Sequence, residues 1–145
     1  FLEVMLHKIL NKTMADENHQ VVSVSSDEDA HYMKKPCQTC PWRKDAVGVF
    51  PAEAFRISAH TSYDMSKRTF GCHSTGVERP RTCAGFLLKG ATHNLSVRLG
   101  IVKGIYDLDK VSDNGLDLFP NYKSMAIANG VSPDDDSLTL SRTDV

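Results

Sequence analysis

The sequence predicts a small single domain that is mostly α-helical, or α+β with little strand, and is built around a metal site. Apolar residues recur at spacings of three and four in several short segments, whereas no set of alternating strands is evident. The four cysteines fall into two pairs that together suit one metal ion. With 145 residues, 41% of them hydrophobic and 24% charged, the chain is long enough to bury one core.

The first third of the chain is weakly patterned, and residues 1–33 are predicted to be a flexible extension and linker. The apolar spacing of residues 2–10 is that of a short amphipathic helix. Met14 opens a stretch typical of a soluble N-terminus, so residues 1–13 are interpreted as an upstream extension. Residues 15–31 hold three valines, too little apolar material for a packed segment. These valines could form one edge strand: Val21, Val22 and Val24.

No segment of the chain suits a membrane span. The apolar N-terminal stretch carries Glu3, His7 and Lys8, which makes it too short and too charged for a span or a secretory signal. No other stretch approaches about eighteen consecutive apolar residues. We therefore expect no membrane partner and a cytoplasmic location.

The globular domain is predicted to cover residues 34–130 and to begin its helices at residue 51. A helix over residues 51–63 would place Pro51 at its favourable first position. A shorter apolar turn over residues 84–88 is expected to end at Gly90.

The best periodic segment covers residues 92–108 and is predicted to be the main core helix, with Thr92 or Asn94 as its N-cap. Its predicted core-facing residues are Leu95, Leu99, Val102, Ile105 and Tyr106. A last helix is expected over residues 120–128, stopped by the Asn-Gly pair that follows it. Residues 131–145 are then predicted to be a solvated acidic tail.

Charge is distributed unevenly along the chain. Residues 34–103 contain twelve Lys and Arg against four Asp and Glu, a net charge of +8. Residues 1–33 carry −4 and residues 104–145 carry −5, which gives −1 for the whole chain. Either the ends simply neutralise the body, or the basic middle forms a face for nucleic acid or another acidic partner. The candidate basic contacts are Arg43, Lys44, Lys67, Arg68, Arg79 and Arg81.

Cys37 and Cys40 are separated by two residues, a spacing that lets both thiolates of a tight turn reach one metal ion. Cys72 and Cys83 follow as a second pair, and the four together form a closed tetrahedral set for zinc. His73 is a fifth candidate ligand and could replace Cys72, since adjacent residues seldom both point at one ion. A closed set indicates a structural role, in which metal binding is coupled to folding.

Two alternatives use the same cysteines. Four thiolates, with Pro41 after the second, also suit an iron–sulfur cluster. Alternatively, Cys37 and Cys40 could work as a dithiol exchange pair, with the pKa of a thiol lowered by a helix start or by Arg43. The βαβ context of a thioredoxin-like pair is lacking, and a disulfide framework is disfavoured because no export signal is present.

Other side chains point less clearly to chemistry. His60 suits a surface or partly packed position, while His93 suits helix capping or a contact with a metal ligand. Trp42 is expected to cover the metal as part of the core, with base stacking as the alternative. No acid–base pair, phosphate-binding loop, Ser-His-Asp order or zinc-protease motif is present, so no catalytic residues are predicted and an enzymatic activity is left open.

The stretches PCQTCPWR, FGCHST, CAGFLL and HNLSVRL, in this order, resemble a family of small uncharacterised cysteine-motif proteins of bacteriophages and bacteria. The resemblance covers about residues 35–100. It implies a phage or prophage context and one shared site on the four cysteines, with His73 nearby. No activity is implied by the resemblance.

The residues and the resemblance together predict a small intracellular, phage-type protein with a structural zinc. We expect it to act by binding nucleic acid or a host protein, in the host cytoplasm if it is encoded by a phage. The alternative is an iron–sulfur or dithiol redox protein or metalloenzyme that uses the same cysteines.

Overall fold

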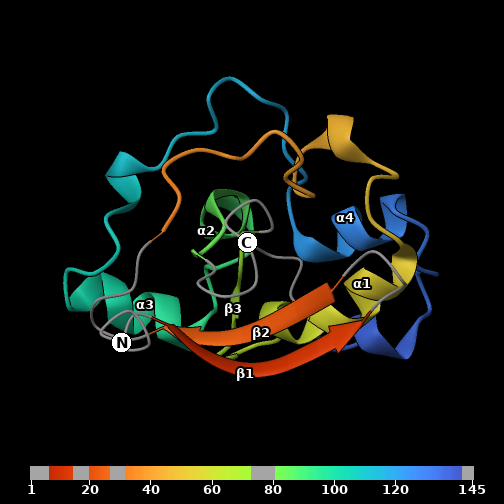
Figure 1. Ribbon diagram of the computed structural model, residues 1–145, viewed down its shortest axis with the longest axis horizontal. Coiled ribbons are helices and arrows are strands. Elements are labelled where there is room, and N and C mark those ends of the chain that lie inside the picture. Colours follow the sequence, from red (N-terminus) through yellow and green to blue (C-terminus); the bar gives the residue numbers. More distant parts are fainter. Residues whose placement is uncertain (1–6, 15–19, 27–31, 73–80, 142–145) are drawn as a thin grey trace.

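The computed structural model describes residues 7–14, 20–26, 32–72 and 81–141. These residues form a small, mostly helical protein, as predicted. In Figure 1, α2 occupies the middle of the molecule, α3 lies on one side of it and α1 and α4 on the other, while two long strands curve across. The helices are α1 (Ala52–Ser58), α2 (Ala84–Lys89), α3 (Leu95–Val102) and α4 (Tyr122–Ala128).

Three strands form one antiparallel sheet in the order β1-β2-β3. Strands β1 (His7–Met14) and β2 (Gln20–Ser26) make a hairpin, and β2 also pairs with the two-residue β3 (Thr69–Phe70). The helix predicted for residues 2–10 is therefore wrong from His7 onward, because pairing with β2 outweighs the local apolar spacing.

The strand expected at the three valines is present as β2, but it lies in the middle of the sheet order and is not an edge strand. Part of the stretch predicted to be a flexible extension is thus paired to the segment that leads into Cys72.

Beyond β3 the sheet continues as single bridges. Gly71 pairs antiparallel with Thr82, and Thr82 also pairs with Tyr32 on its other side. The amide of Met33 donates to the carbonyl of Thr82 at 2.9 Å. Thr82 is fully buried and its hydroxyl lies 3.0 Å from the hydroxyl of Tyr106. The second cysteine pair is thereby fixed by backbone pairing on both sides.

Most of the predicted helix boundaries are confirmed. Pro51 directly precedes α1, which continues as a 3-10 turn over Ala59–Ser62. The segment α2 begins after Cys83 and ends at Gly90. The side chain of Asn121 caps α4, and Gly130, with φ of 103°, follows its end in the left-handed region that favours glycine.

Helix α3 is shorter than predicted and presents the opposite face to the core. Asn94 caps it, as one of the two candidates, by accepting a hydrogen bond from the amide of Val97 at 3.0 Å. Val97 and Gly100 are its buried residues, whereas Leu99 and Val102 are exposed, so the prediction is wrong for these two. Beyond the helix, Tyr106 is buried as predicted, and Ile105 packs partly buried against the core. A side chain at Gly100 would collide with the ring of Tyr106, so the ring can pack against the helix only at this glycine.

Trp42 lies at the centre of the core. Its ring makes edge contacts with Phe70 and Tyr122 at centroid distances of 6.0 and 5.9 Å and a tilted contact with Phe86 at 6.4 Å. These partners come from β3, α2 and α4, so one indole joins the cysteine segments to the C-terminal helix. No helix of the described residues is long and apolar enough to cross a membrane.

The segment after α4, predicted to be an acidic tail, packs against the body as far as Ser141. Val131 and Leu138 are buried, and Ser141 bridges to Tyr63 in the backbone. Two apolar residues at this spacing are enough to dock a segment whose acidic side chains mostly remain outside.

Candidate metal centre

The chain makes two consecutive tight turns, first from Cys37 to Cys40 and then from Cys40 to Arg43. The amide of Cys40 donates to the carbonyl of Cys37 at 3.1 Å, and the amide of Arg43 donates to the carbonyl of Cys40 at 3.0 Å. Pro36 and Pro41 flank the turn and restrict its backbone. Cys40 is fully buried, while Cys37 is half-buried at the edge of the core.

Arg43 braces this turn from outside. Its guanidinium holds both carboxylate oxygens of Asp45 at 2.7 Å and also donates to the carbonyl of Cys37 at 3.2 Å. The hydrogen bonds to Asp45 raise the pKa of Arg43 and lower that of Asp45. Arg43 therefore acts in the architecture of the turn and is not an unpaired charge on its surface.

The second cysteine pair lies on a short antiparallel ladder. The amide of Cys72 donates to the carbonyl of Arg81 at 2.6 Å, and the amide of Cys83 donates to the carbonyl of Phe70 at 2.8 Å. Side chains alternate along paired strands, so Phe70, Cys72 and Cys83 point to the same face of this ladder. Because Phe70 contacts Trp42, this is the face turned toward the Cys37–Cys40 turn.

Thiols from the two pairs meet in the core. The Sγ atoms of Cys40 and Cys83 are 3.6 Å apart although the residues are separated by 43 positions. Cys40 also shares a hydrogen bond with Cys37, and the contacts with Cys37 and Cys83, together with burial, raise the pKa of the Cys40 thiol far above its ordinary value. These contacts and burial therefore favour the neutral form of the Cys40 thiol.

The separation of the Cys40 and Cys83 sulfurs is that of a hydrogen bond between two thiols and is also close to that of two sulfurs bound to one metal ion. In a tetrahedron with zinc–sulfur bonds of about 2.3 Å, neighbouring sulfurs lie about 3.8 Å apart. A disulfide needs about 2.05 Å, and no disulfide joins any of the four cysteines. The observed 3.6 Å therefore suits two ligands of one ion.

The rest of the ligand set is not assembled around one point. Within the described ranges, no three His, Cys, Asp or Glu side chains form a group that could hold a metal ion as they stand. His73, the fifth predicted ligand, lies outside these ranges. The structure thus brings Cys37, Cys40 and Cys83 into contact and places Cys72 on the same ladder face as Cys83.

Trp42, two residues after Cys40, lies in the core, and its predicted role as a cover for a metal stays a prediction. Its side chain is fully buried against α2, where a Cβ on Gly85 would lie 2.5 Å from the Trp42 Cβ. The indole Nε1 is also buried and has no hydrogen-bond partner among the described residues. A buried donor without an acceptor costs about 1–3 kcal/mol, so the cysteine region is incompletely satisfied.

The structure describes five of the six predicted basic residues, and two of them take part in ion pairs. Lys44 pairs with Asp117 at 3.5 Å, as Arg43 pairs with Asp45. Lys67 and Arg68 are exposed and lie together before β3. Arg81 is also exposed, beside the cysteine ladder, and Arg79 lies outside the described residues.

Of the two weaker histidines, His60 has ordinary structural surroundings, whereas the Nε2 of His93 is a buried nitrogen without a hydrogen-bond partner within the described residues. The Nδ1 of His60 lies 2.9 Å from the carbonyl of Ile57, and burial lowers the pKa of His60. His93 precedes Asn94, which performs the capping role itself, and the backbone carbonyl of His93 accepts from the amide of Met65.

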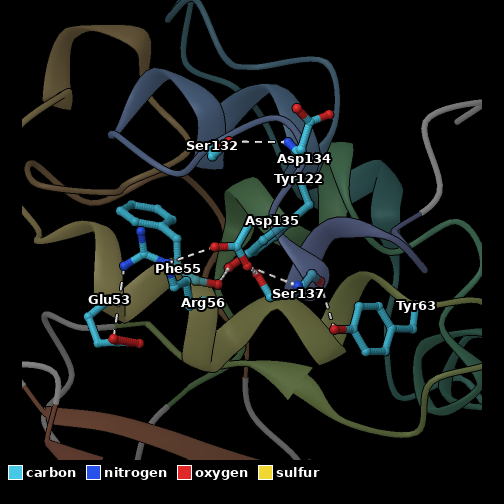
Figure 2. A network of polar contacts seen from close by, with 9 residues as sticks. All are labelled: Glu53, Phe55, Arg56, Tyr63, Tyr122, Ser132, Asp134, Asp135 and Ser137. Atoms are coloured by element: carbon cyan, nitrogen blue, oxygen red, sulfur yellow. Dashed lines mark hydrogen bonds and ion pairs between the residues drawn. The ribbon is translucent and has the colours of Figure 1, made fainter.

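A second polar cluster, which the sequence did not reveal, joins α1, α4 and the C-terminal segment. Figure 2 shows Tyr122 reaching α1, where its hydroxyl donates to the carbonyl of Phe55 at 2.6 Å. The same hydroxyl contacts the Ser58 hydroxyl, also at 2.6 Å. Arg56 donates to Asp135 at 3.0 Å. No motif spacing marks this cluster, because its members lie 64 to 79 residues apart.

The donors in this second cluster have acceptors at each position. Hydrogen bonds from Ser137, then from Arg56, lower the pKa of Asp135 to about 2. The Tyr63 hydroxyl donates to the Ser137 carbonyl at 2.7 Å (Figure 2). Burial raises the pKa of Tyr122, which keeps its hydroxyl a donor. The cluster is a structural clamp without an orphaned polar atom, so the cysteine region is the better candidate for function.

Comparison with known protein families identifies one match. Residues 32–142 match the model of DUF6283, a family of unknown function, and the chain belongs to this family. No curated protein and no solved structure matches the chain. The family match begins just before the Cys37–Cys40 turn and ends beyond the docked C-terminal segment, so it spans both clusters.

Proposed function

We propose that this member of the DUF6283 family is a zinc-binding protein whose metal is structural and that it acts by binding a nucleic acid or a host protein. The observation that carries the proposal is the 3.6 Å contact between the sulfurs of Cys40 and Cys83, two thiols from segments that the fold brings together deep in the core. The resemblance of the motifs to phage and bacterial proteins gives the cellular context of the proposal.

The ligands would be Cys37, Cys40 and Cys83, with Cys72 or His73 as the fourth. A divalent cation would draw the protons from these thiols and replace their mutual hydrogen bonds. The ligands leave no open position for a substrate, which is why the proposed role is structural. The metal would tie the Cys37–Cys40 turn to the ladder that leads into α2.

The decisive experiment is elemental analysis with an ultraviolet–visible spectrum, on protein purified in the absence of air and without a metal-binding tag. About one zinc per chain and no visible band, as expected for a four-ligand site, would support the proposal. Iron with sulfide and a broad band near about 400 nm would replace it with an iron–sulfur protein. Folded protein without metal would end the metal hypothesis.

Cys83→Ser is the informative variant, and Leu138→Ala is its matched control. Cys83→Ser should lose zinc, because it removes a ligand from the centre of the thiol contact. Leu138 is buried in the C-terminal segment, so Leu138→Ala should cost about 2–5 kcal/mol of stability while retaining zinc. Equal zinc content in both variants would contradict the assigned ligands.

The binding role is tested separately, by titrating the metal-loaded protein with single-stranded and duplex DNA at several salt concentrations. Phosphate contacts would make the affinity fall steeply as salt rises. Absence of salt-dependent binding to either DNA would restrict the proposed partner to protein.

A further inference from the structure

Helix α3 carries an apolar stripe on its solvent side. Leu99 is 50% exposed, Ile101 is 42% exposed and Val102 is 84% exposed. Leu99 and Val102 are three positions apart, so they lie on the same face of the helix. Most surface apolar residues are scattered singly, whereas these three adjoin on one short element, which indicates a surface made for contact.

A second segment extends this stripe. Residues 65–68 run beside the start of α3, because the amide of Leu95 donates to the carbonyl of Ser66 at 2.7 Å and Asn94 donates to the carbonyl of Arg68 at 2.7 Å. Met65 belongs to this segment and is 52% exposed. Its φ of 60° is rare for a residue with a side chain, so the chain keeps an exposed apolar residue here against a backbone preference.

Basic side chains surround the apolar residues. We define the α3 surface by its apolar and basic members: Met65, Lys67, Arg68, Arg98, Leu99, Ile101, Val102 and Lys103. Each of them is exposed, and α3 itself contains no acidic residue. With the neighbouring Asp64 included, the surface carries four positive charges and one negative charge, a net +3 on a chain of net charge −1.

This composition selects one kind of occupant. If two copies of the chain met through this surface, a net charge of +3 would face a net charge of +3, and this repulsion disfavours self-association. Surfaces that bind single-stranded nucleic acid usually carry aromatic side chains on which the bases stack, and the α3 surface has none. An interfacial membrane helix usually carries aromatic anchors and is longer than the eight residues of α3.

We propose that the α3 surface docks an acidic amphipathic segment of a partner protein. Apolar side chains of that segment would cover Leu99, Ile101 and Val102, and its carboxylates would meet the surrounding Lys and Arg. The inference deepens the binding role proposed above by assigning it a surface and a partner chemistry. It does not depend on the identity of the metal.

The test uses the full metal-loaded chain and a fluorescent synthetic helical peptide with leucines at positions i, i+3, i+4 and i+7 and with Glu and Asp between them. A scrambled peptide of the same composition is the control. Fluorescence anisotropy should show binding to the patterned peptide that is at least about tenfold tighter than to the scrambled one, because only the patterned peptide presents one apolar face.

The variant L99E/V102E should weaken binding by at least about tenfold, since it places charges in the centre of the contact and opposes the carboxylates of the peptide. Arg98→Gln should weaken binding by about two- to fivefold and reduce its salt dependence. The matched control is Leu140→Glu, because Leu140 is 65% exposed but lies on the docked C-terminal segment. It should leave the affinity unchanged.

Several results would overturn the inference. These are equal binding of both peptides, equal loss in L99E/V102E and Leu140→Glu, or tighter binding of single-stranded DNA or phosphatidylserine vesicles that L99E/V102E abolishes. Metal content measured on the same samples separates this outcome from the proposed function. Peptide binding by protein that contains no zinc would leave docking intact while the zinc hypothesis fails.

Discussion

The cysteine region and the C-terminal clamp lie on either side of the same aromatic core, yet they are held together in different ways. In the clamp, the hydroxyl of Tyr122 donates to Phe55 and contacts Ser58, and Arg56 meets Asp135. In the cysteine region, the thiols of Cys40 and Cys83 contact each other and the buried Nε1 of Trp42 has no acceptor among the described residues.

This difference is informative because both regions are deeply buried. Buried polar groups in native proteins are nearly always paired, and the clamp follows this rule with protein groups alone. In the cysteine region the Nε1 of Trp42 is an exception to this rule among the described residues, although the backbone there is also held by hydrogen bonds. The orphaned Nε1 of Trp42 beside a cluster of thiols is the feature on which the proposed metal site can be tested against the clamp.

Among the variants that test this comparison, Gly85→Ala is expected to lower the free energy of unfolding the most. The added Cβ would lie 2.5 Å from Cβ and 2.7 Å from Cγ of Trp42, which are the least movable atoms of that side chain. Overpacking of this kind should cost about 3 kcal/mol, in spite of the preference of helices for alanine. Chemical denaturation measures the cost, and elemental analysis should show a weakened hold on zinc.

Gly48→Ala is the control for this substitution. Gly48 has a φ of 90°, and a Cβ there would meet nothing within 4 Å. It should therefore cost about 1–2 kcal/mol through the backbone alone and leave the metal content unchanged. If both variants lose the same stability and metal, the cysteine region does not depend on the contact between Trp42 and α2.

A smaller effect is expected from Tyr122→Phe in the clamp. The substitution removes the hydroxyl that joins Phe55 and Ser58 and should cost about 2 kcal/mol, since those buried groups lose a partner. Denaturation is again the measurement, and zinc should stay bound because no thiol is touched. Loss of zinc in this variant would show that the two regions do not hold independently.

Tyr63→Phe provides the graded comparison within the clamp. Tyr63 donates one hydrogen bond to Ser137 and is partly buried, so its loss should cost about 1 kcal/mol. A cost equal to or greater than that of Tyr122→Phe would contradict the ranking by burial.

The smallest effect concerns pH. The pKa of Asp135 is lowered to about 2 by Ser137 and Arg56, whereas an unfolded Asp titrates near about 3.9. The stabilising contribution of Asp135 is therefore complete above about pH 4 and is lost as pH falls toward 2. Thermal denaturation should show wild type and Asp135→Asn converging between pH 5 and pH 2. A difference that is constant with pH would contradict this assignment.

Local signals in the sequence were sufficient for several helix ends and for the tight turn at Cys37 and Cys40. Asn121 and Gly130 bound α4, and Gly90 ends α2, because capping and left-handed conformations depend on single residues. The two-residue spacing of Cys37 and Cys40 likewise predicts a tight turn, and the structure has one.

Features that depend on distant partners were not predicted. The face of α3 is set by Tyr106 packing on Gly100, so counting apolar residues placed Tyr106 in the core correctly but also placed Leu99 and Val102 there, which face solvent. The residues of β1 follow a helical spacing but pair with β2. The clamp connects residues up to 79 positions apart, and no local pattern predicts such pairs.

The contact between Cys40 and Cys83 also has a consequence for the order in which the chain folds. These sulfurs meet only after a loop of 43 residues has closed. The conformational entropy of that loop is therefore lost before the contact contributes any stability. Cys37 and Cys40, in contrast, are joined by a local turn that forms without long-range closure. The Cys37–Cys40 turn can therefore form early in a nascent chain, before the segments that carry Cys72 and Cys83 pair with each other.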